Sequence, residues 1–275
     1  MFIVAATDSV LIAPSWERVT AEEARRLGEA PAADVGDALQ RMTVMDGGIR
    51  LLTERAALLG NALTVDVRSG DNLAIHRALD EARPGDVLVV NGHGDITRAL
   101  IGGLIGEIMV NAGIVGAVVD GAIRDVQALS ELGLPVYARA ITPAGPFKEG
   151  PGAIGVPVAV GGVVVAPGDV LVGDADGVVV VPHRRVREVA DTVGGIVDRQ
   201  EALRQRILAA RPNHPKAARP DHTGAARPDQ PEAARADHSG AARPDHPEAA
   251  RADHSGAARP DHPEAARADH SGPAR

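Results

Sequence analysis

The stretch Gly116-Ala117-Val118-Val119-Asp120-Gly121-Ala122-Ile123-Arg124-Asp125 decides how the rest of the chain is interpreted. Its apolar run predicts a buried strand over Gly116–Asp120, of the kind found in parallel sheets. The segment Val126–Leu132 that follows is expected to be a helix. The polar pair Arg124 and Asp125 therefore stands between a strand and a helix. This is the carboxyl end of the strand, where α/β sheets bind their ligands.

Two interpretations of this pair are open from the local sequence. Arg124 offers a planar fork of donors that matches a carboxylate. Asp125 offers a hard oxygen ligand for Mg²⁺ or Mn²⁺. Alternatively, Asp125 is simply the N-cap of the helix Val126–Leu132. The first interpretation predicts an active site, and the second predicts only a helix start.

The flanking sequence alternates between strands and helices. Helices are expected after a capping box at Thr20, and over Asp34–Met42, Asn72–Ala82, part of Arg98–Asn111 up to a C′ glycine at Gly113, and Pro182–Leu208. Strands are expected at Asn61–Arg68, Val87–Asn91, Pro135–Ile141, Val156–Val160, Val163–Val165 with Val170–Val172, and Val178–Val181. The order predicts an α/β fold in which helices pack on a mixed sheet with a β-rich layer behind it.

Three other glycine-containing segments are candidate sites. The segment Asn91–Arg98 is expected to be a loop, and it fails as a dinucleotide fingerprint because Thr97 stands where the third glycine belongs. The segment Gly102–Ile105 precedes a helix, so its backbone N–H groups either hold an anion or only allow close packing. The segment Gly173–Gly177 is expected to be a hairpin turn. We expect His76 on a helix surface and His183 near the start of the last helix.

Composition limits the possible functions. The net charge of −8 argues against nucleic acid as a partner. The chain has no cysteine, which excludes disulfides and thiolate nucleophiles. No run of about 18 apolar residues is present, so no membrane span is expected and a cytoplasmic location is predicted.

The sequence changes character after Leu208. From Ala217 it repeats every eight residues, beginning Ala217-Ala218-Arg219-Pro220-Asp221-His222-Thr223-Gly224. These repeats contain no Leu, Ile, Val or Phe, so they cannot bury enough apolar surface to offset the entropy of ordering. We therefore expect one domain over residues 1–208 and a disordered Ala/Arg/Pro/Asp/His tail over 209–275.

Taken together, these segments resemble the RraA-like family, which includes class II 4-hydroxy-4-methyl-2-oxoglutarate aldolases and regulators of ribonuclease E. The resemblance spans roughly Asp34 to Leu208. It is carried by Val87–Gly92, Arg98–Gly102, Gly116–Asp125, Thr142–Pro146 and Gly173–Pro182. It implies a swivelling β/β/α-type fold with mixed sheets, assembled as a homotrimer or a dimer of trimers with sites at subunit boundaries.

The resemblance also implies an activity and a set of site residues. The activity is a metal-dependent lyase reaction on 2-oxo acids: retro-aldol cleavage of 4-hydroxy-4-methyl-2-oxoglutarate, oxaloacetate decarboxylation, or both, through pyruvate enolate. Gly102, Gly103, Leu104 and Ile105 match the segment whose N–H groups hold the pyruvyl carboxylate. Arg124 matches the substrate-binding arginine, and Asp125 matches the ligand of Mg²⁺ or Mn²⁺.

The chain departs from the aldolases at one position. They carry an acidic residue with twenty residues between it and the arginine, and that position is Gly103 here. Glu201 is the match for an acid that a neighbouring subunit's last helix provides. With no His or Lys evident nearby in sequence, metal-bound water is the expected proton carrier. The alternative function is a non-catalytic regulator that binds an RNase or another protein; a methyltransferase is rejected because no glycine-rich cofactor loop is present.

Overall fold

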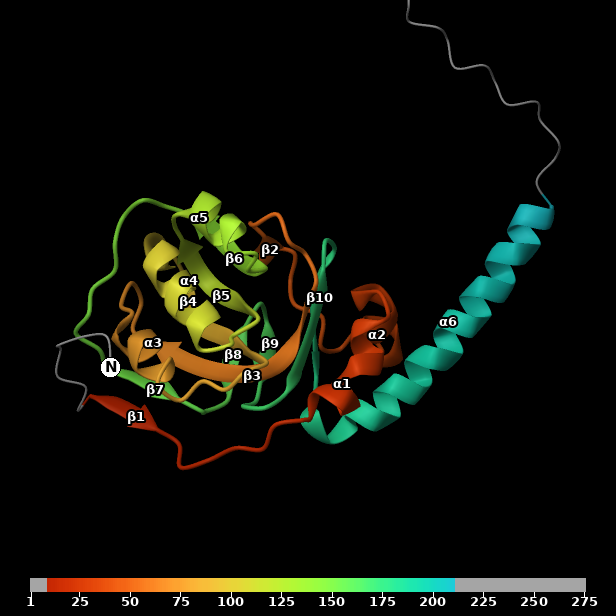
Figure 1. Cartoon of the computed structure of the whole chain (residues 1–275), viewed down its shortest axis with the longest axis horizontal. Coiled ribbons are helices and arrows are strands. Elements are labelled where there is room, and N and C mark those ends of the chain that lie inside the picture. The colour runs from red at the N-terminus through yellow and green to blue at the C-terminus, as the bar shows by residue number, and fades with distance from the viewer. Residues whose placement is uncertain (1–8, 211–275) are drawn as a thin grey trace, which may run out of the picture. The chain divides into compact units, whose positions relative to one another are not determined.

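The computed structural model describes residues 9–210 of the chain (Figure 1). The chain divides into two units, Met1–Pro215 and Lys216–Arg275. Apart from Ala209 and Ala210, the predicted disordered tail lies outside the described residues. No helix within 9–210 is long and apolar enough to cross a membrane.

Four parallel strands form the centre of the main sheet. They are β3 (Leu58–Val67), β4 (Asp86–Ile101), β5 (Gly116–Ile123) and β6 (Val136–Ile141). Because neighbouring strands run in the same direction, their carboxyl ends meet at one edge of the sheet. The buried strand predicted over Gly116–Asp120 is confirmed, and β5 continues three residues further to Ile123 with all eight residues buried.

Antiparallel and short strands complete a mixed sheet. At one end, β7 (Gly152–Ile154) pairs antiparallel with β3, and β1 (Val10–Ile12) pairs parallel with β7. At the other end, β2 (Arg50–Leu51) pairs with β6. The hairpin β10 (Val170–Asp174) and β11 (Gly177–Val181) joins β3, while β8 (Val158–Val160) and β9 (Val163–Val165) form a separate hairpin. The mixed α/β fold is therefore confirmed.

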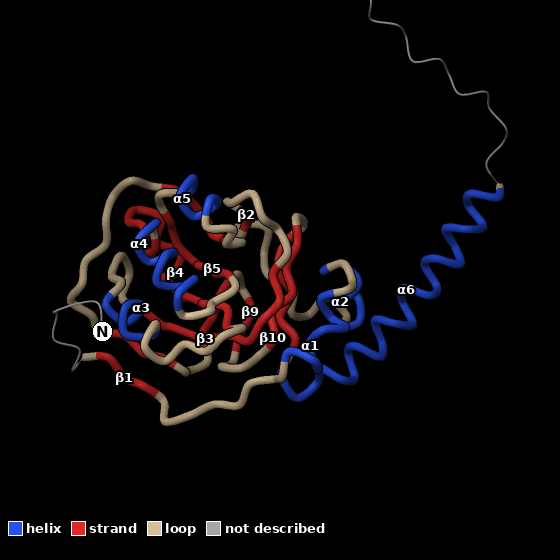
Figure 2. The backbone as a smooth tube through the Cα atoms, in the orientation of Figure 1, coloured by secondary structure: helices blue, strands red, loops and turns tan. Residues whose placement is uncertain are grey.

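Helices gather in two groups (Figure 2). One face of the parallel strands packs against α3 (Leu73–Ala78), α4 (Gly103–Asn111) and α5 (Val126–Glu131). The other face packs against the β8–β9 hairpin through a Val-rich core. The second group packs on β10 and β11, and consists of α1 (Ala21–Gly28), α2 (Ala32–Ala38) and α6 (Val186–Ala209), which follows the short 3₁₀ helix η1 (His183–Arg185).

The capping box predicted at Thr20 is confirmed. Thr20 Oγ1 accepts a hydrogen bond of 3.3 Å from the Glu23 backbone N–H, and Glu23 Oε2 accepts one of 3.2 Å from the Thr20 N–H. The carboxylate of Glu23 also accepts from Arg187 in α6, and this contact is the main reason its pKa is lowered. The start of α1 is thereby tied to the start of the last helix.

Several predicted boundaries are wrong. Asn91–Arg98 is part of β4 and not a loop, because the strand continues through register shifts and the positive φ of His93 and Gly94. The helix predicted over Asp34–Met42 ends at Ala38, because Gln40 and Arg41 adopt positive φ. The helix predicted over Asn72–Ala82 is confined to Leu73–Ala78. The segments Val163–Val165 and Val170–Val172 belong to different hairpins.

Candidate active site

The Arg124–Asp125 pair lies where β5 passes into α5. The Arg124 N–H donates to the Ile101 carbonyl at 3.0 Å, so the end of β5 is tied to the end of β4. Asp125 adopts a left-handed conformation with φ of 54°. Such a backbone is rare for a residue other than glycine, and it turns the Asp125 side chain away from the strand direction.

The Asp125 side chain caps the start of α4 and not the start of α5, the helix that follows it in the sequence. Its side chain makes no capping hydrogen bond to α5. Instead, Asp125 Oδ2 accepts a hydrogen bond of 3.0 Å from the Gly103 N–H, at the first residue of α4. Asp125 thus occupies the N-cap position of α5, as the second interpretation predicted, but its side chain does not cap that helix. The residue brings a carboxylate to the positive end of the neighbouring helix dipole.

The glycine at the N-cap of α4 makes this approach possible. Gly102 has an extended backbone and provides no side-chain cap. A Cβ at Gly102 would lie 2.6 Å from Asp125 Oδ2 and 2.8 Å from Arg124 Cγ. The prediction that all of Gly102–Ile105 precedes a helix is wrong in its bounds, because Gly102 is the N-cap and Gly103–Ile105 form the first turn of α4. The close approach of two side chains explains the glycine at position 102.

Arg124 and Asp125 remain accessible to a ligand. The Arg124 Nε lies 3.4 Å from Asp125 Oδ2, and the two side chains are 40% and 48% exposed. An ion pair with this exposure contributes at most about 1 kcal/mol to stability. The pair is therefore held loosely enough for either group to exchange its partner for a substrate or a cation.

A cavity of about 130 Å³ lies beside Arg124. Its wall combines the end of β4, the start of α4, α3 with its N-cap, the β5–α5 junction and the segment between β6 and β7. The residues are Asn72, His76, Ala99, Leu100, Ile101, Gly102, Leu104, Ile105, Arg124, Pro146 and Lys148. Three members of the predicted carboxylate-binding segment are included. The structure thus brings Arg124 and this segment together around one space.

The sequence prediction missed two cationic or titratable members of this wall. His76, expected on a helix surface, is only partly exposed and lines the cavity, and Lys148 comes from the segment between β6 and β7. Burial, and secondarily the charge of Lys148, lowers the pKa of His76. No His or Lys is close to Arg124 in the sequence, but the fold brings His76 and Lys148 into the same cavity wall. The order of the elements could have indicated that His76 lies near Arg124, because α3 follows β3 at the same sheet edge where β5 ends.

The segment carrying Lys148 is fixed by buried contacts. Asp71 is 1% exposed, and its Oδ2 accepts hydrogen bonds from the N–H groups of Glu149 and Gly150 at 2.7 and 3.0 Å. Arg98 stacks 4.1 Å from the centre of the Phe147 ring and donates to the Gly145 carbonyl. Lys148 therefore extends from an anchored backbone.

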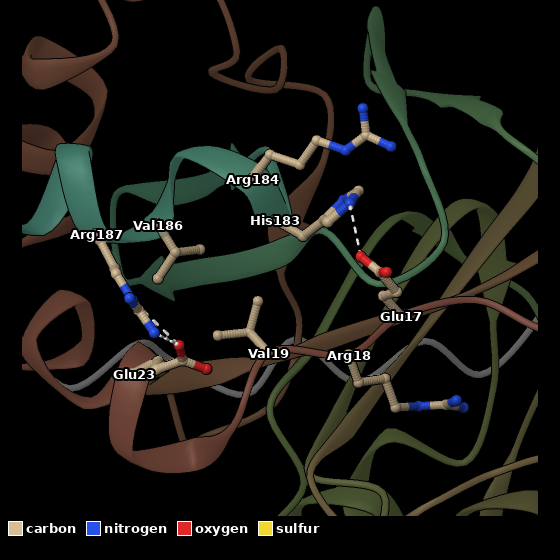
Figure 3. A pocket seen from close by; sticks show the side chains of 8 residues that line it. All are labelled: Glu17, Arg18, Val19, Glu23, His183, Arg184, Val186 and Arg187. Atoms are coloured by element: carbon tan, nitrogen blue, oxygen red, sulfur yellow. Dashed lines mark hydrogen bonds and ion pairs between the residues drawn. The ribbon is translucent and has the colours of Figure 1, made fainter.

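Other sequence candidates do not join this site. Gly173–Gly177 forms the β10–β11 turn, as predicted. His183 lies in η1, where its Nδ1 is 3.2 Å from Asp169 Oδ1. It lines a separate hollow of about 360 Å³, in which Arg187 is paired with Glu23 (Figure 3). Glu201 is exposed on α6 and is not in the wall of the cavity beside Arg124.

The acidic side chains near the cavity supply few ligands for a cation. Within residues 9–210, no cluster of three or more His, Cys, Asp or Glu side chains could hold a metal ion. Asp125 is the single carboxylate at the start of α4, since Gly103 has no side chain. Mg²⁺ commonly binds through one or two carboxylates and keeps several waters. Asp125 therefore fits a magnesium-type site completed by water and substrate oxygens.

The chain matches known proteins over the region that contains this site. The model of the RraA-like family, described as Aldolase/RraA, matches residues 32–180. A Halalkalibacterium halodurans protein named "Putative 4-hydroxy-4-methyl-2-oxoglutarate aldolase" is 45% identical over 159 residues, which is 58% of this chain and 76% of that protein. The Thermus thermophilus 4-hydroxy-4-methyl-2-oxoglutarate aldolase is 36% identical, over 56% of this chain and 94% of its own length.

A solved structure supports the same fold. The Streptomyces coelicolor protein RraAS2, described as an unusual member of the RNase ES inhibitor RraA protein family, superposes with a TM-score of 0.64 and 32% identity. The match covers 70% of this chain and 100% of that one. The relatives named as aldolases support a lyase activity.

Proposed function

Because the chain belongs to the RraA-like (Aldolase/RraA) family, we propose that it is a divalent-metal-dependent lyase that acts on 2-oxo acids through pyruvate enolate. The reactions are retro-aldol cleavage of 4-hydroxy-4-methyl-2-oxoglutarate, oxaloacetate decarboxylation, or both. The observation that carries the proposal is the meeting of Arg124, Asp125 and the N-terminus of α4, where Arg124 and the first turn of α4 line one cavity.

The arrangement suits the charge that these reactions develop. Both reactions break the bond between C3 and C4 of a 2-oxo acid, and this leaves negative charge on the enolate oxygen at C2. The guanidinium of Arg124 supplies fixed donors for that oxygen, in a site that is partly shielded from water. Backbone N–H groups of Gly103–Ile105 would hold the pyruvyl carboxylate at the positive end of α4, and so orient the scissile bond.

Asp125 would hold Mg²⁺ or Mn²⁺ beside the same donors. When bound, a divalent ion would polarise the ketone and stabilise the enolate charge. The positions of Asp125 and Arg124, on adjacent residues whose side chains lie 3.4 Å apart, allow both to act on one 2-oxo acid head group. The two proposed substrates share this head group and differ at their other end, so the same pair of residues could serve both lyase reactions.

A pyruvate assay tests the proposal directly. The full chain is supplied with oxaloacetate or 4-hydroxy-4-methyl-2-oxoglutarate, and pyruvate is followed through lactate dehydrogenase, with Mg²⁺, with Mn²⁺ and with excess chelator. We expect metal-dependent pyruvate release that the chelator abolishes and added metal restores. No release from either substrate above the metal-only background would overturn the lyase proposal.

A second candidate function is a regulator that binds an RNase or another protein. The RraAS2 match and the absence of a side chain at Gly103 favour keeping it. A regulator needs no turnover, so the same assay separates the two functions when it is combined with a binding measurement on an RNase E-type enzyme. Inhibition of that RNase by an inactive Asp125→Ala variant would show that regulation is independent of the lyase site.

The last helix carries exposed apolar residues that support a proposal about subunit contacts. Apolar residues recur on α6 every three or four positions; Val186, Val189 and Val193 are buried against α1 and α2, and Leu203 and Ile207 continue the same stripe but are 53% and 56% exposed. In Figure 1, α6 extends past α1 and α2. We propose that Leu203 and Ile207 pack on a neighbouring subunit of a homotrimer, which would bring Glu201 to that subunit's site.

The double variant Leu203→Asp with Ile207→Asp is expected to convert the assembly to monomers, because burying two such side chains contributes about 1.5–3 kcal/mol each. Sedimentation velocity measures the change, and Ala202→Asp, on another face of α6, is the control. We also expect pyruvate formation to fall about tenfold or more in the double variant. An unchanged sedimentation coefficient would remove α6 from the interface.

Restoring a carboxylate at position 103 is expected to tighten metal binding. A Cβ at Gly103 would lie 3.8 Å from Asp125 Oδ2, so Gly103→Asp places a second hard ligand beside the first. We expect the Mg²⁺ concentration for half-maximal activity to fall about tenfold. Gly47→Asp, at a position with no atom within 4 Å of an added Cβ, controls for general charge effects.

A further inference from the structure

The cavity beside Arg124 contains one side chain suited to carry a proton. Among the residues in its wall, only His76, Arg124 and Lys148 have titratable side chains. A guanidinium keeps its proton at any relevant pH. Lys148 is exposed, and its ammonium group offers hydrogen-bond donors but no acceptor. His76 is therefore the group in this wall that can both accept and donate a proton near neutral pH.

His76 is positioned by a packed helix. Its neighbours Leu73, Ala74 and Ile75 are buried in the main core, which fixes α3 against β3. Asn72, at the N-cap of α3, is 2% exposed and donates from Nδ2 to the Leu100 carbonyl at 3.0 Å. The imidazole is thus presented from a rigid support on the side of the cavity formed by α3.

The polar atoms around His76 are incompletely satisfied. Within residues 9–210, the buried atoms His76 Nδ1 and Asn72 Oδ1 have no hydrogen-bond partner. Buried polar atoms usually find partners, and a catalytic role is one of the explanations for those that do not. The lowered pKa of His76, caused by burial and then by Lys148, favours the neutral imidazole, which is the form that accepts a proton.

We propose that His76 is the proton carrier of the retro-aldol reaction, an inference that rests on the proposed lyase function. The imidazole takes the proton of the C4 hydroxyl as the C4–O bond becomes a carbonyl and the C3–C4 bond breaks. The electron pair of that bond forms the enolate of the first pyruvate. The imidazolium then returns the same proton to C3. One 4-hydroxy-4-methyl-2-oxoglutarate gives two pyruvates, with no net gain or loss of protons.

The variant His76→Gln tests this role. It keeps a polar side chain of similar length but cannot relay a proton. We expect kcat for 4-hydroxy-4-methyl-2-oxoglutarate cleavage to fall about 100-fold or more, with KM within about threefold of the wild-type value. His183→Asn, in the separate hollow of Figure 3, is the matched control and should leave both constants unchanged.

Two further readouts separate proton transfer from a structural role. Exchange of the pyruvate methyl protons with D₂O, followed by NMR, requires proton removal from C3 and should slow about 100-fold in His76→Gln. Added imidazole should raise the cleavage rate of His76→Ala, but not that of Lys148→Ala. A loss of activity without slower exchange, or without rescue, would overturn the proton-carrier role.

The outcomes also distinguish this inference from the proposed function. If the wild-type protein neither cleaves the substrates nor exchanges pyruvate protons, the lyase proposal itself fails. If the wild-type protein does both and His76→Gln matches it in both, the lyase function stands and the assignment of His76 is overturned. Circular dichroism melting of each variant verifies that the comparison concerns folded protein.

Discussion

Replacing Asp125 or Arg124 by alanine is expected to lower pyruvate formation by at least about a hundredfold, because each would remove a group that stabilises the enolate charge. Stability should change little. Both side chains are about half exposed, and their mutual ion pair is weak. A large loss of rate with a nearly unchanged melting temperature is the signature of a residue that acts in the reaction.

The two variants should fail in different ways. Asp125→Ala is expected to raise the metal concentration needed for activity, whereas Arg124→Ala should raise KM and lower kcat together, since the guanidinium would contact both substrate and enolate. Arg124→Lys keeps the charge but loses the planar fork, and should recover only part of the rate. Arg184→Ala and Asp176→Ala, outside the cavity, are the charge-matched controls. Full activity in either Asp125→Ala or Arg124→Ala would place the chemistry elsewhere.

The sequence was sufficient to locate this pair because the surrounding signals are local. The apolar run before Asp120 predicts a buried strand, and the strand order places its end at a ligand-binding edge. Even so, the prediction could not distinguish a helix cap from a site residue. That distinction depends on the left-handed backbone of Asp125 and on the Gly103 N–H it contacts, which lies 22 positions away along the chain.

Non-local contacts explain what the sequence did not predict. His76 and Lys148 are 72 residues apart in the sequence and line the same cavity because hydrogen bonds, including those to Asp71, hold the segment that carries Lys148 beside α3. Similarly, a strand that continues through positive φ at His93 and Gly94 has no simple periodicity, so Asn91–Arg98 was predicted as a loop. Pairing with β5 on one side keeps this segment in the sheet.

Gly102→Ala is expected to remove most of the activity from a protein that still folds. Gly102 has an extended backbone with φ of −157°, so alanine introduces no backbone strain there. The added methyl group would lie 2.6 Å from Asp125 Oδ2 and 2.8 Å from Arg124 Cγ. Both contacts are with side chains that have room to move, so these side chains should shift rather than the strands that carry them.

A displacement of about 1 Å in a group that orients substrate can reduce a rate by about 100-fold. We therefore expect kcat/KM to fall to that extent in Gly102→Ala, with a melting temperature within a few degrees of wild type. The control is Gly47→Ala, where an added Cβ meets no atom within 4 Å and activity should be unchanged. If Gly102→Ala stayed fully active, neither Arg124 nor Asp125 would need the close approach to α4 on which the proposed site depends.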